Sequence, residues 1–204
     1  MKFLLSSIVA AAIVGVLAAP SAEPPAPQPD TGTPSATGVH GGHYYFWQTD
    51  NQATAYYNNT NNGTYSLQWS GGKGNLVGGK GWNPGTADRV INYNGTYQAR
   101  GKSLLGVYGW TRNALTEYYI VESYGRRDPS SGAKHRGSVR CNGARYDILS
   151  TWRKDQPSIE GTATFEQFWS VRSRKKRLGG EISGTVDVAC HFDAWKKVGM
   201  NWLV

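Results

Sequence analysis

The chain has 204 residues, with 22 Lys and Arg against 14 Asp and Glu, which gives a formal net charge of +8 at pH 7. Its two cysteines are too few for a zinc cluster and its four histidines show no ligand spacing, so we expect no metal site and no cofactor. The basic excess is the only feature that favours a nucleic-acid partner, and we expect none. We interpret the basic run Arg172–Arg177 as the solvated face of a hairpin.

The N-terminal region lacks the pattern of a folded domain. A basic start and the apolar run Phe3–Ala19 predict a signal peptide over residues 1–18. The run is short for a membrane span, which needs about 20 apolar residues, so we expect a secreted, extracellular protein without a membrane partner. Residues 19–42 are rich in Pro, Ala, Ser and Thr and predict a disordered linker or propeptide. Residues 43–204 are then one domain.

The domain is expected to be all-β. Short aromatic and β-branched runs alternate with Gly, Asn and Ser, a pattern that predicts a sandwich, jelly roll or barrel. The expected strands are Tyr44–Trp47, Thr64–Trp69, Arg89–Tyr93, Tyr97–Ala99, Leu104–Trp110, Tyr118–Glu122, Arg145–Arg153, Thr162–Val171 and Gly184–Val188.

One segment departs from the β pattern. His191–Val198 places its apolar residues at helical spacing and Gly199 follows as a stop, which predicts a short amphipathic helix. In an oxidising compartment, Cys141 and Cys190 predict one disulfide, which would tie the start of this helix to the sheet.

The stretch Tyr108–Glu122 contains the strongest candidate for chemistry. In a strand, Glu117 and Tyr119 share one face, an arrangement that suits a carboxylate held in a fixed place. The alternative is an ordinary surface glutamate. Glu122 has odd spacing from Glu117 and is expected on the opposite face, so we do not assign it as a second catalytic carboxylate.

Several motifs in order resemble the family eleven glycoside hydrolases, the small endo-β-1,4-xylanases. They are Tyr65–Trp69, Gly74–Trp82, Tyr108–Arg112, Glu117–Glu122, Pro129–Gly132, Tyr146–Ile148, Gln156–Thr162, Gln167–Arg172 and Cys190–Trp195. The resemblance implies a jelly-roll β-sandwich of two twisted antiparallel sheets with one short α-helix. It also implies a long cleft with a thumb loop, and a monomer whose partner is xylan in the plant cell wall.

The resemblance also implies roles for individual residues. Glu117 stands where the family has its nucleophile, in a retaining mechanism that uses two carboxyl groups about 5 Å apart. The substrate-binding positions are Asn75, Tyr108, Tyr119, Arg153, Pro157, Gln167 and Trp169. Of these, Tyr119 and Gln167 are expected to hydrogen-bond Glu117. Cys141 and Cys190 match a disulfide that some members of the family have.

The sequence departs from the family at its C-terminal end. The family's acid/base Glu lies on a strand after the helix, and this sequence stops at Val204 before such a motif, so we expect a C-terminally truncated domain without that residue. One hypothesis is a secreted endo-1,4-β-xylanase that cleaves internal bonds of xylan with retention, through a glycosyl intermediate on Glu117. The alternative is a catalytically impaired xylan- or wall-binding protein on the same fold.

Overall fold

The computed structural model describes residues 32–99 and 101–201, in which the chain is mostly β with a single helix. The strands are β1 (Ala36–His40), β2 (His43–Thr49), β3 (Thr54–Asn59), β4 (Tyr65–Ser70), β5 (Leu76–Gly81), β6 (Val90–Tyr97), β7 (Leu104–Thr111), β8 (Thr116–Tyr124), β9 (Lys134–Cys141), β10 (Ala144–Ser158), β11 (Gly161–Arg172) and β12 (Gly180–Asp187), and helix α1 is Val188–Lys197. The predicted signal peptide lies outside the described residues. Within them, no helix is long and apolar enough to cross a bilayer.

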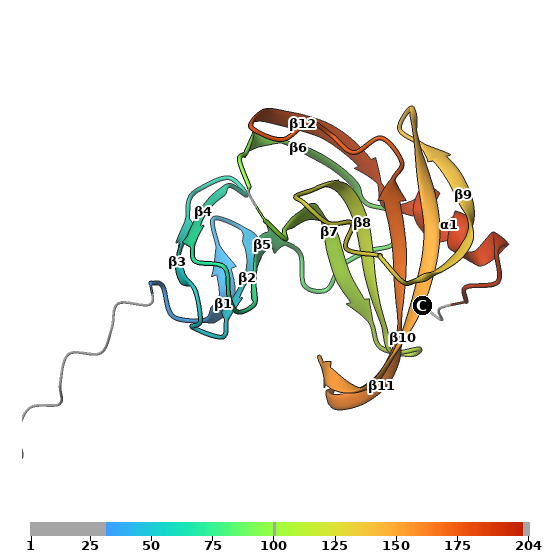
Figure 1. The fold of residues 1–204 in the computed structure, drawn as a ribbon, viewed down its shortest axis with the longest axis horizontal. Coiled ribbons are helices and arrows are strands. Elements are labelled where there is room, and N and C mark those ends of the chain that lie inside the picture. The colour runs from blue at the N-terminus through green and yellow to red at the C-terminus, as the bar shows by residue number, and fades with distance from the viewer. Residues whose placement is uncertain (1–31, 100, 202–204) are drawn as a thin grey trace, which may run out of the picture.

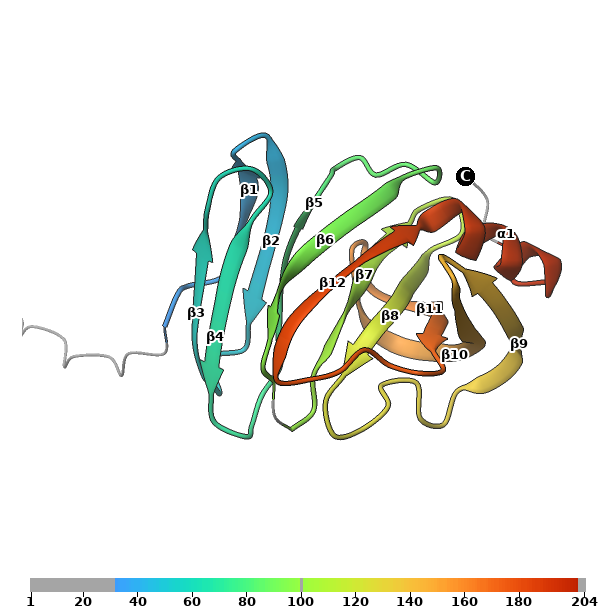
Figure 2. The same cartoon turned by 90° about the horizontal axis from the view of Figure 1, so that it is seen from above.

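The strands build a two-layered sandwich (Figure 1). One layer contains the sheets β1-β2-β5 and β7-β8-β11-β10-β9, and the other contains the pairs β3-β4 and β6-β12. The pairing is antiparallel except between β8 and β11, which run parallel. Figure 2 shows β6 and β12 lying over β7 and β8, with α1 continuing from β12. The all-β jelly-roll class predicted from the sequence is confirmed.

The main core lies between the five-stranded sheet and the elements that cover it. Ile120, Ile148 and Phe168 from the sheet are at most 2% exposed and pack with residues of β6, β12 and α1. Full burial of one such side chain contributes about 1.5–3 kcal/mol. We call this covered face of the five-stranded sheet the outer face, and the opposite one the inner face.

Helix α1 packs on the outer face near β9. Asp187 caps it, because its carboxylate accepts a hydrogen bond from the backbone N of Cys190 at 3.2 Å. The Trp195 ring is 1% exposed, and its Nε1 donates to Ser170 Oγ at 3.0 Å. Cys190 forms the predicted disulfide with Cys141. The helix and the crosslink are therefore confirmed, although the helix begins earlier than predicted.

The prediction of a disordered linker over residues 19–42 is wrong for residues 32–42, the part that the structure describes. Residues 36–40 form β1, which pairs with β2 along its whole length. Gly41 and Gly42 have φ of 58° and 77°, the left-handed values that a two-residue hairpin turn requires. Trp47 Nε1 also donates to Thr33 O at 2.8 Å. Three of its five residues are exposed, so this edge strand carries little hydrophobic signal in its composition.

Other strands also escaped the sequence pattern. In β5 the close approach of the layers explains one glycine: a Cβ on Gly78 would lie 3.0 Å from the Trp47 ring and 3.1 Å from that of Tyr57, whereas a Cβ on Gly79 or Gly81 would meet nothing within 4 Å. β3 ends in two asparagines and β9 is basic, so neither has the expected composition. The segments predicted over Arg89–Tyr93 and Tyr97–Ala99 are largely one continuous strand, β6.

Each layer is divided into two sheets. Within the described residues, β5 pairs only with β2, and β7 pairs only with β8. In the other layer β4 pairs only with β3, and β6 only with β12, across the same range of the chain. Such edges present backbone N–H and C=O groups without a strand partner.

Candidate active site

Glu117 lies on the inner face, on a strand fixed from both sides. In β8 it pairs with Trp110 of β7 and with Gln167 of β11. Only 8% of Glu117 is exposed, which is low for a carboxylate that has no cation within salt-bridge distance in the described residues. Its neighbours must therefore satisfy it by hydrogen bonds.

Each oxygen of the Glu117 carboxylate accepts one hydrogen bond from a neutral donor. Tyr119 Oη donates to Oε1 at 2.6 Å, and Gln167 Nε2 donates to Oε2 at 2.6 Å. Burial and the charge of Glu117 raise the pKa of Tyr119, so the phenol stays protonated and keeps donating. The prediction that both residues hydrogen-bond Glu117 is confirmed.

Aromatic rings hold the Tyr119 hydroxyl in place. Trp169 stacks on Tyr119 with ring centroids 4.0 Å apart and an angle of 6° between the planes, and Tyr108 tilts against it at 5.1 Å. Trp110 Nε1 donates to Tyr108 Oη at 2.7 Å. Tyr108 is 37% exposed beside the buried carboxylate. Sequence analysis missed Trp110, although its alternation with Tyr108 places both on the same face.

The strands β10 and β11 extend beyond the sheet and curl at their far ends (Figure 1). Arg153 and Pro157 lie on this extension, with a register shift between Arg153 and Gln156. Arg153 donates to the side chain of Gln156 at 3.1 Å. Its charge also acts to lower the pKa of Tyr119, although burial and Glu117 outweigh it. Arg153 thus acts electrostatically on Tyr119, which hydrogen-bonds Glu117.

The tip of this extension contacts the opposite hairpin. Glu160 forms an ion pair with Arg112, in the turn between β7 and β8, with Oε1 and Nη1 3.5 Å apart. Because β7 and β8 carry Tyr108 and Glu117, this contact joins the tip to the strands of the site. Sequence analysis did not foresee the contact, which depends on how far the extension curls.

Asn75 lies apart from this constellation. It precedes β5, is exposed, and its backbone N donates to Asp50 Oδ2 at 2.8 Å. No hydrogen bond or ion pair within residues 32–99 and 101–201 joins its side chain to Glu117. The structure thus gathers the other predicted site residues on the five-stranded sheet, whereas Asn75 lies immediately before β5 of the three-stranded sheet.

The other glutamates near this sheet have partners elsewhere. Glu166 lies on the outer face and pairs with Arg136 at 3.4 Å. Glu160 is occupied by Arg112, and Glu122 is 1% exposed on the outer face. In the part of the chain that the structure describes, no second carboxylate hydrogen-bonds a residue that binds Glu117.

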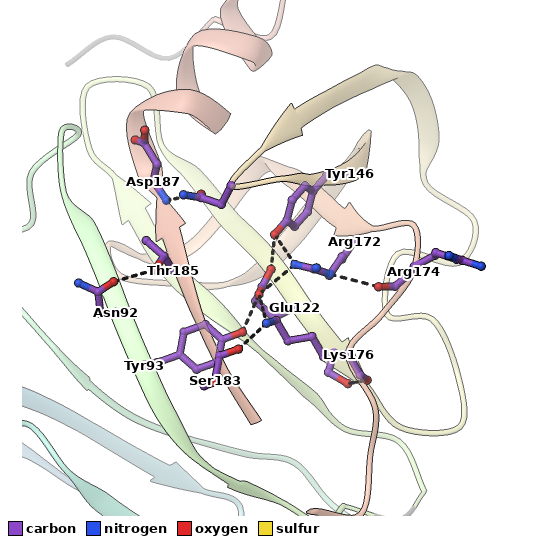
Figure 3. Close-up of polar contacts among 12 residues, drawn as sticks. Asn92, Tyr93, Glu122, Tyr146, Arg172, Arg174, Lys176, Ser183, Thr185 and Asp187 are labelled. Atoms are coloured by element: carbon purple, nitrogen blue, oxygen red, sulfur yellow. Dashed lines mark hydrogen bonds and ion pairs between the residues drawn. The ribbon is translucent and has the colours of Figure 1, made fainter. Parts of the chain in front are cut away.

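Glu122 is the centre of a buried polar cluster (Figure 3). Tyr93 Oη donates to its Oε2 at 2.6 Å, and Tyr146 Oη donates to its Oε1. Arg172 and Lys176 lie 3.4 and 3.7 Å from its Oε2. Burial, with the hydrogen bond to Glu122, raises the pKa of both phenols. The basic run is therefore not simply a solvated face, because two of its cations neutralise a buried carboxylate.

No group of three or more His, Cys, Asp or Glu side chains in the described residues could hold a metal ion. The chemistry at Glu117 is that of a carboxylate, its neutral donors and the surrounding rings.

A β-sandwich whose inner face holds a fixed carboxylate among aromatic rings has the architecture of a glycoside hydrolase. Residues 40–203 match the family model described as glycosyl hydrolases family 11, and the chain belongs to that family.

Three similar proteins are each named as an endo-1,4-beta-xylanase. The chain is 68% identical over 171 residues to Endo-1,4-beta-xylanase A of Schizophyllum commune, covering 84% of this chain and 87% of that protein. It is 63% identical over 171 residues to Endo-1,4-beta-xylanase 1 of Leucoagaricus gongylophorus, with coverages of 84% and 73%. It is 50% identical over 195 residues to Endo-1,4-beta-xylanase of Thermomyces lanuginosus, with coverages of 96% and 84%.

Proposed function

We propose that this protein is an endo-1,4-β-xylanase that hydrolyses internal β-1,4 bonds of xylan with retention, and that Glu117 is its nucleophile. One observation carries the proposal: Glu117 is a fixed carboxylate that neutral donors hold at both oxygens, without a salt-bridge partner among the described residues. An ion pair would lower the reactivity of such a group, whereas neutral hydrogen bonds orient it. The relatives' names favour this proposal over a binding protein without catalysis.

In the proposed first step, a Glu117 oxygen attacks the anomeric carbon, and an ester bond forms as the bond to the leaving oxygen breaks. Water then attacks the same carbon, the ester breaks, and the carboxylate is restored; the proton that this water loses to solvent balances the one that the leaving oxygen takes from it. Tyr119 and Gln167 hold the carboxylate in line throughout. We assign Tyr108, half-exposed beside the site, to the sugar bound there, and Trp169 to the support of Tyr119. Arg153 and Pro157 grip the chain from the curled extension.

The proposal gives no described residue the role of general acid. Its test therefore uses a substrate whose leaving group needs no proton. A 2,4-dinitrophenyl 2-deoxy-2-fluoro-β-xylobioside releases a stable phenolate, and the fluorine slows hydrolysis of the ester so that it accumulates. We expect a single adduct on the peptide that contains Glu117, measured by mass spectrometry of the digested protein.

Glu117→Gln should abolish this adduct, while Glu166→Gln, on the outer face of the neighbouring strand, should not change it. An adduct on another residue, or one that persists in Glu117→Gln, would refute the assignment. The same variants then report on the natural substrate: reducing sugar released from xylan should be lost only with Glu117→Gln.

We further propose that the protein acts outside the cell. The disulfide between Cys141 and Cys190 supports this, since such bonds persist in oxidising compartments. The signal-like start of the sequence agrees with it. N-terminal sequencing of protein recovered from a culture medium tests the proposal, and a chain found only inside the cell contradicts it.

A further inference from the structure

Three asparagines stand in the acceptor sequence Asn-X-Thr, to which eukaryotic secretory pathways attach N-linked sugar chains: Asn58, Asn62 and Asn94. The first two lie in the hairpin of β3 and β4, and the third lies on β6. We propose that Asn94 is the acceptor of an N-linked glycan, in preference to the two asparagines of the hairpin. The inference rests on the proposed action outside the cell, and the similar proteins come from fungi, whose secretory pathways contain the transferase.

Asn94 faces solvent on the layer that covers the five-stranded sheet. Along β6, Tyr93 points into the sandwich, where its hydroxyl reaches Glu122. Asn94 and Thr96 point to the other side, because strand side chains alternate, and both are exposed. Figure 3 shows this alternation one step earlier, with Tyr93 directed to Glu122 and Asn92 bonded to β12 instead. A glycan on Asn94 would therefore project into solvent without displacing the core.

The two side chains that the transfer uses are available. The side-chain amide of Asn94 is the nucleophile, and the hydroxyl of Thr96, two residues on, completes the acceptor sequence. In the part of the chain that the structure describes, no hydrogen bond engages either side chain. Gly95 lies between them, and a Cβ there would meet nothing within 4 Å. Because glycine adopts many backbone conformations, this acceptor can leave the strand conformation when it enters the transferase.

The acceptor hydroxyls of the hairpin have partners. Asn62 and Gly63 have φ of 56° and 74°, the values of a type I′ turn, and Asn-Gly is the strongest local signal for a hairpin. The turn brings the two acceptor hydroxyls together: Thr60 Oγ1 and Thr64 Oγ1 lie 2.6 Å apart, and Thr64 Oγ1 donates to Asn61 O at 2.6 Å. Folding of the hairpin thus engages the hydroxyl that each of its acceptor sequences needs.

Distance along the chain separates the two regions in time. β3 and β4 are neighbours in sequence, and a hairpin forms within about 1–10 μs once both strands have emerged. Within the described residues β6 pairs only with β12, and the bond between Asn92 and Thr185 spans 93 residues. At a synthesis rate of about 5–20 residues per second, β6 waits roughly 5–20 s for its partner. Asn94 therefore stays in an unpaired segment while the chain enters the secretory pathway.

The transfer joins Asn94 to an oligosaccharide that is carried on a lipid diphosphate. The side-chain amide nitrogen attacks the anomeric carbon of the first N-acetylglucosamine, and an N–C bond forms. The C–O bond to the diphosphate breaks, the amide loses one proton, and the lipid diphosphate leaves with the electron pair. Since β6 lies over the outer face (Figure 2) and Glu117 lies on the inner face, the glycan stays clear of the candidate site.

The test is expression of the full chain behind a host leader in a yeast that attaches N-linked glycans, so that delivery does not depend on the chain's own start. Peptide-N-glycosidase in heavy-oxygen water converts each glycosylated asparagine to a labelled aspartate, which mass spectrometry of the digest locates. We expect the label on most copies of Asn94 and on few copies of Asn58 or Asn62. Recovered protein without the label on Asn94, or with more label in the hairpin, would overturn the proposal.

Matched variants test the site and the preference separately. Thr96→Val removes the hydroxyl at nearly constant size and should abolish the label on Asn94, whereas Thr96→Ser keeps the hydroxyl and should retain it. Gly63→Ala strains the turn at φ 74° and preserves the acceptor sequence, so the label on Asn58 and Asn62 should rise severalfold. A label on Asn94 that survives Thr96→Val would refute the site. Unchanged labelling of the hairpin in Gly63→Ala would refute the preference.

The proposed function is measured in the same protein. Asn94→Gln should leave the adduct on Glu117 unchanged, and loss of the adduct would contradict a glycan placed away from the site. A labelled Asn94 in a protein that forms no adduct on Glu117 would support the glycan and contradict the proposed nucleophile. N-terminal sequencing of the chain expressed with its own start tests the extracellular location separately.

Discussion

Glu117 and Glu122 lie on one strand, five residues apart, and both are almost fully buried. Their surroundings differ in one respect. Glu117 accepts hydrogen bonds from neutral donors, whereas Glu122 is bonded by two phenols and paired with two cations. The outer-face carboxylate is neutralised, and the inner-face carboxylate is only oriented. The two buried acids are thus distinguished by the charge of their partners rather than by their burial.

The two carboxylates should differ most in what their loss does to stability. Glu122→Ala removes the buried partner of two partly buried cations, Arg172 and Lys176, so we expect a loss of about 3–5 kcal/mol in the free energy of unfolding. Glu117→Gln removes a charge that has only neutral partners, and should change that free energy by less than about 1 kcal/mol. Urea unfolding at pH 7 measures both. Equal losses in the two variants would contradict the comparison.

On the outer face, the buried His191 should make the stability of the protein depend on pH. Its ring is fully buried against Tyr146, and neither of its nitrogens has a hydrogen-bond partner in the described residues. Burial lowers the pKa of His191 from 6.5 to about 4, although the charges of Glu122 and Asp187 act to raise it. Between these two values the unfolded chain binds a proton that the folded chain does not.

Stability should therefore fall as the pH decreases from about 6.5 toward 4, and His191 alone contributes about 3 kcal/mol of that loss. The variant His191→Phe lacks this group, so its unfolding free energy should depend less steeply on pH in that interval. Exposed His135→Gln is the control and should keep the steep dependence. Parallel curves for His191→Phe and the parent chain would show that His191 does not titrate in this way.

On the inner face, the contribution of Tyr119 to kcat can be compared with that of Tyr118, the preceding residue in the chain. Tyr119→Phe removes one of the two hydrogen bonds to Glu117, and we expect kcat on an aryl xylobioside to fall about 10- to 100-fold. Tyr118→Phe makes the same chemical change on the outer face, where the ring packs against Phe192 and Trp195, and should leave kcat unchanged. A similar fall in both variants would point to general damage to β8.

The two faces were not equally predictable from the sequence. Period-two spacing correctly paired Glu117 with Tyr119 and separated Glu122 from both, because a strand fixes which side each residue faces. The partners of Glu122 were not predicted, since Tyr93, Tyr146 and Arg172 come from three other strands. Their meeting depends on how the layers stack, which local pattern does not encode.

The same limit explains the missed strands. The helix and the strands around Glu117 have strong local signals, and they were found. β1 and β5 owe their strand conformation to pairing with β2, and a glycine at position 78 reflects the closeness of rings from other strands. Such features depend on tertiary contacts rather than on the intrinsic strand propensity of the segment itself. The pair Arg112–Glu160 is of the same kind, because the two residues lie in different hairpins.

That pair is the exposed counterpart of the ion pairs at Glu122. The side chains of Arg112 and Glu160 are 70% and 41% exposed, so water and salt screen their attraction. A double-mutant cycle with Arg112→Ala and Glu160→Ala should give a coupling free energy of about 0.2–1 kcal/mol. The coupling should vanish at about 1 M salt, where the screening length is about 3 Å. The exchange Arg112→Glu with Glu160→Arg should restore it at low salt. A coupling as large as that of Arg172 with Glu122, or one insensitive to salt, would mean that the tip is held by a desolvated contact and that exposure does not separate the two kinds of pair.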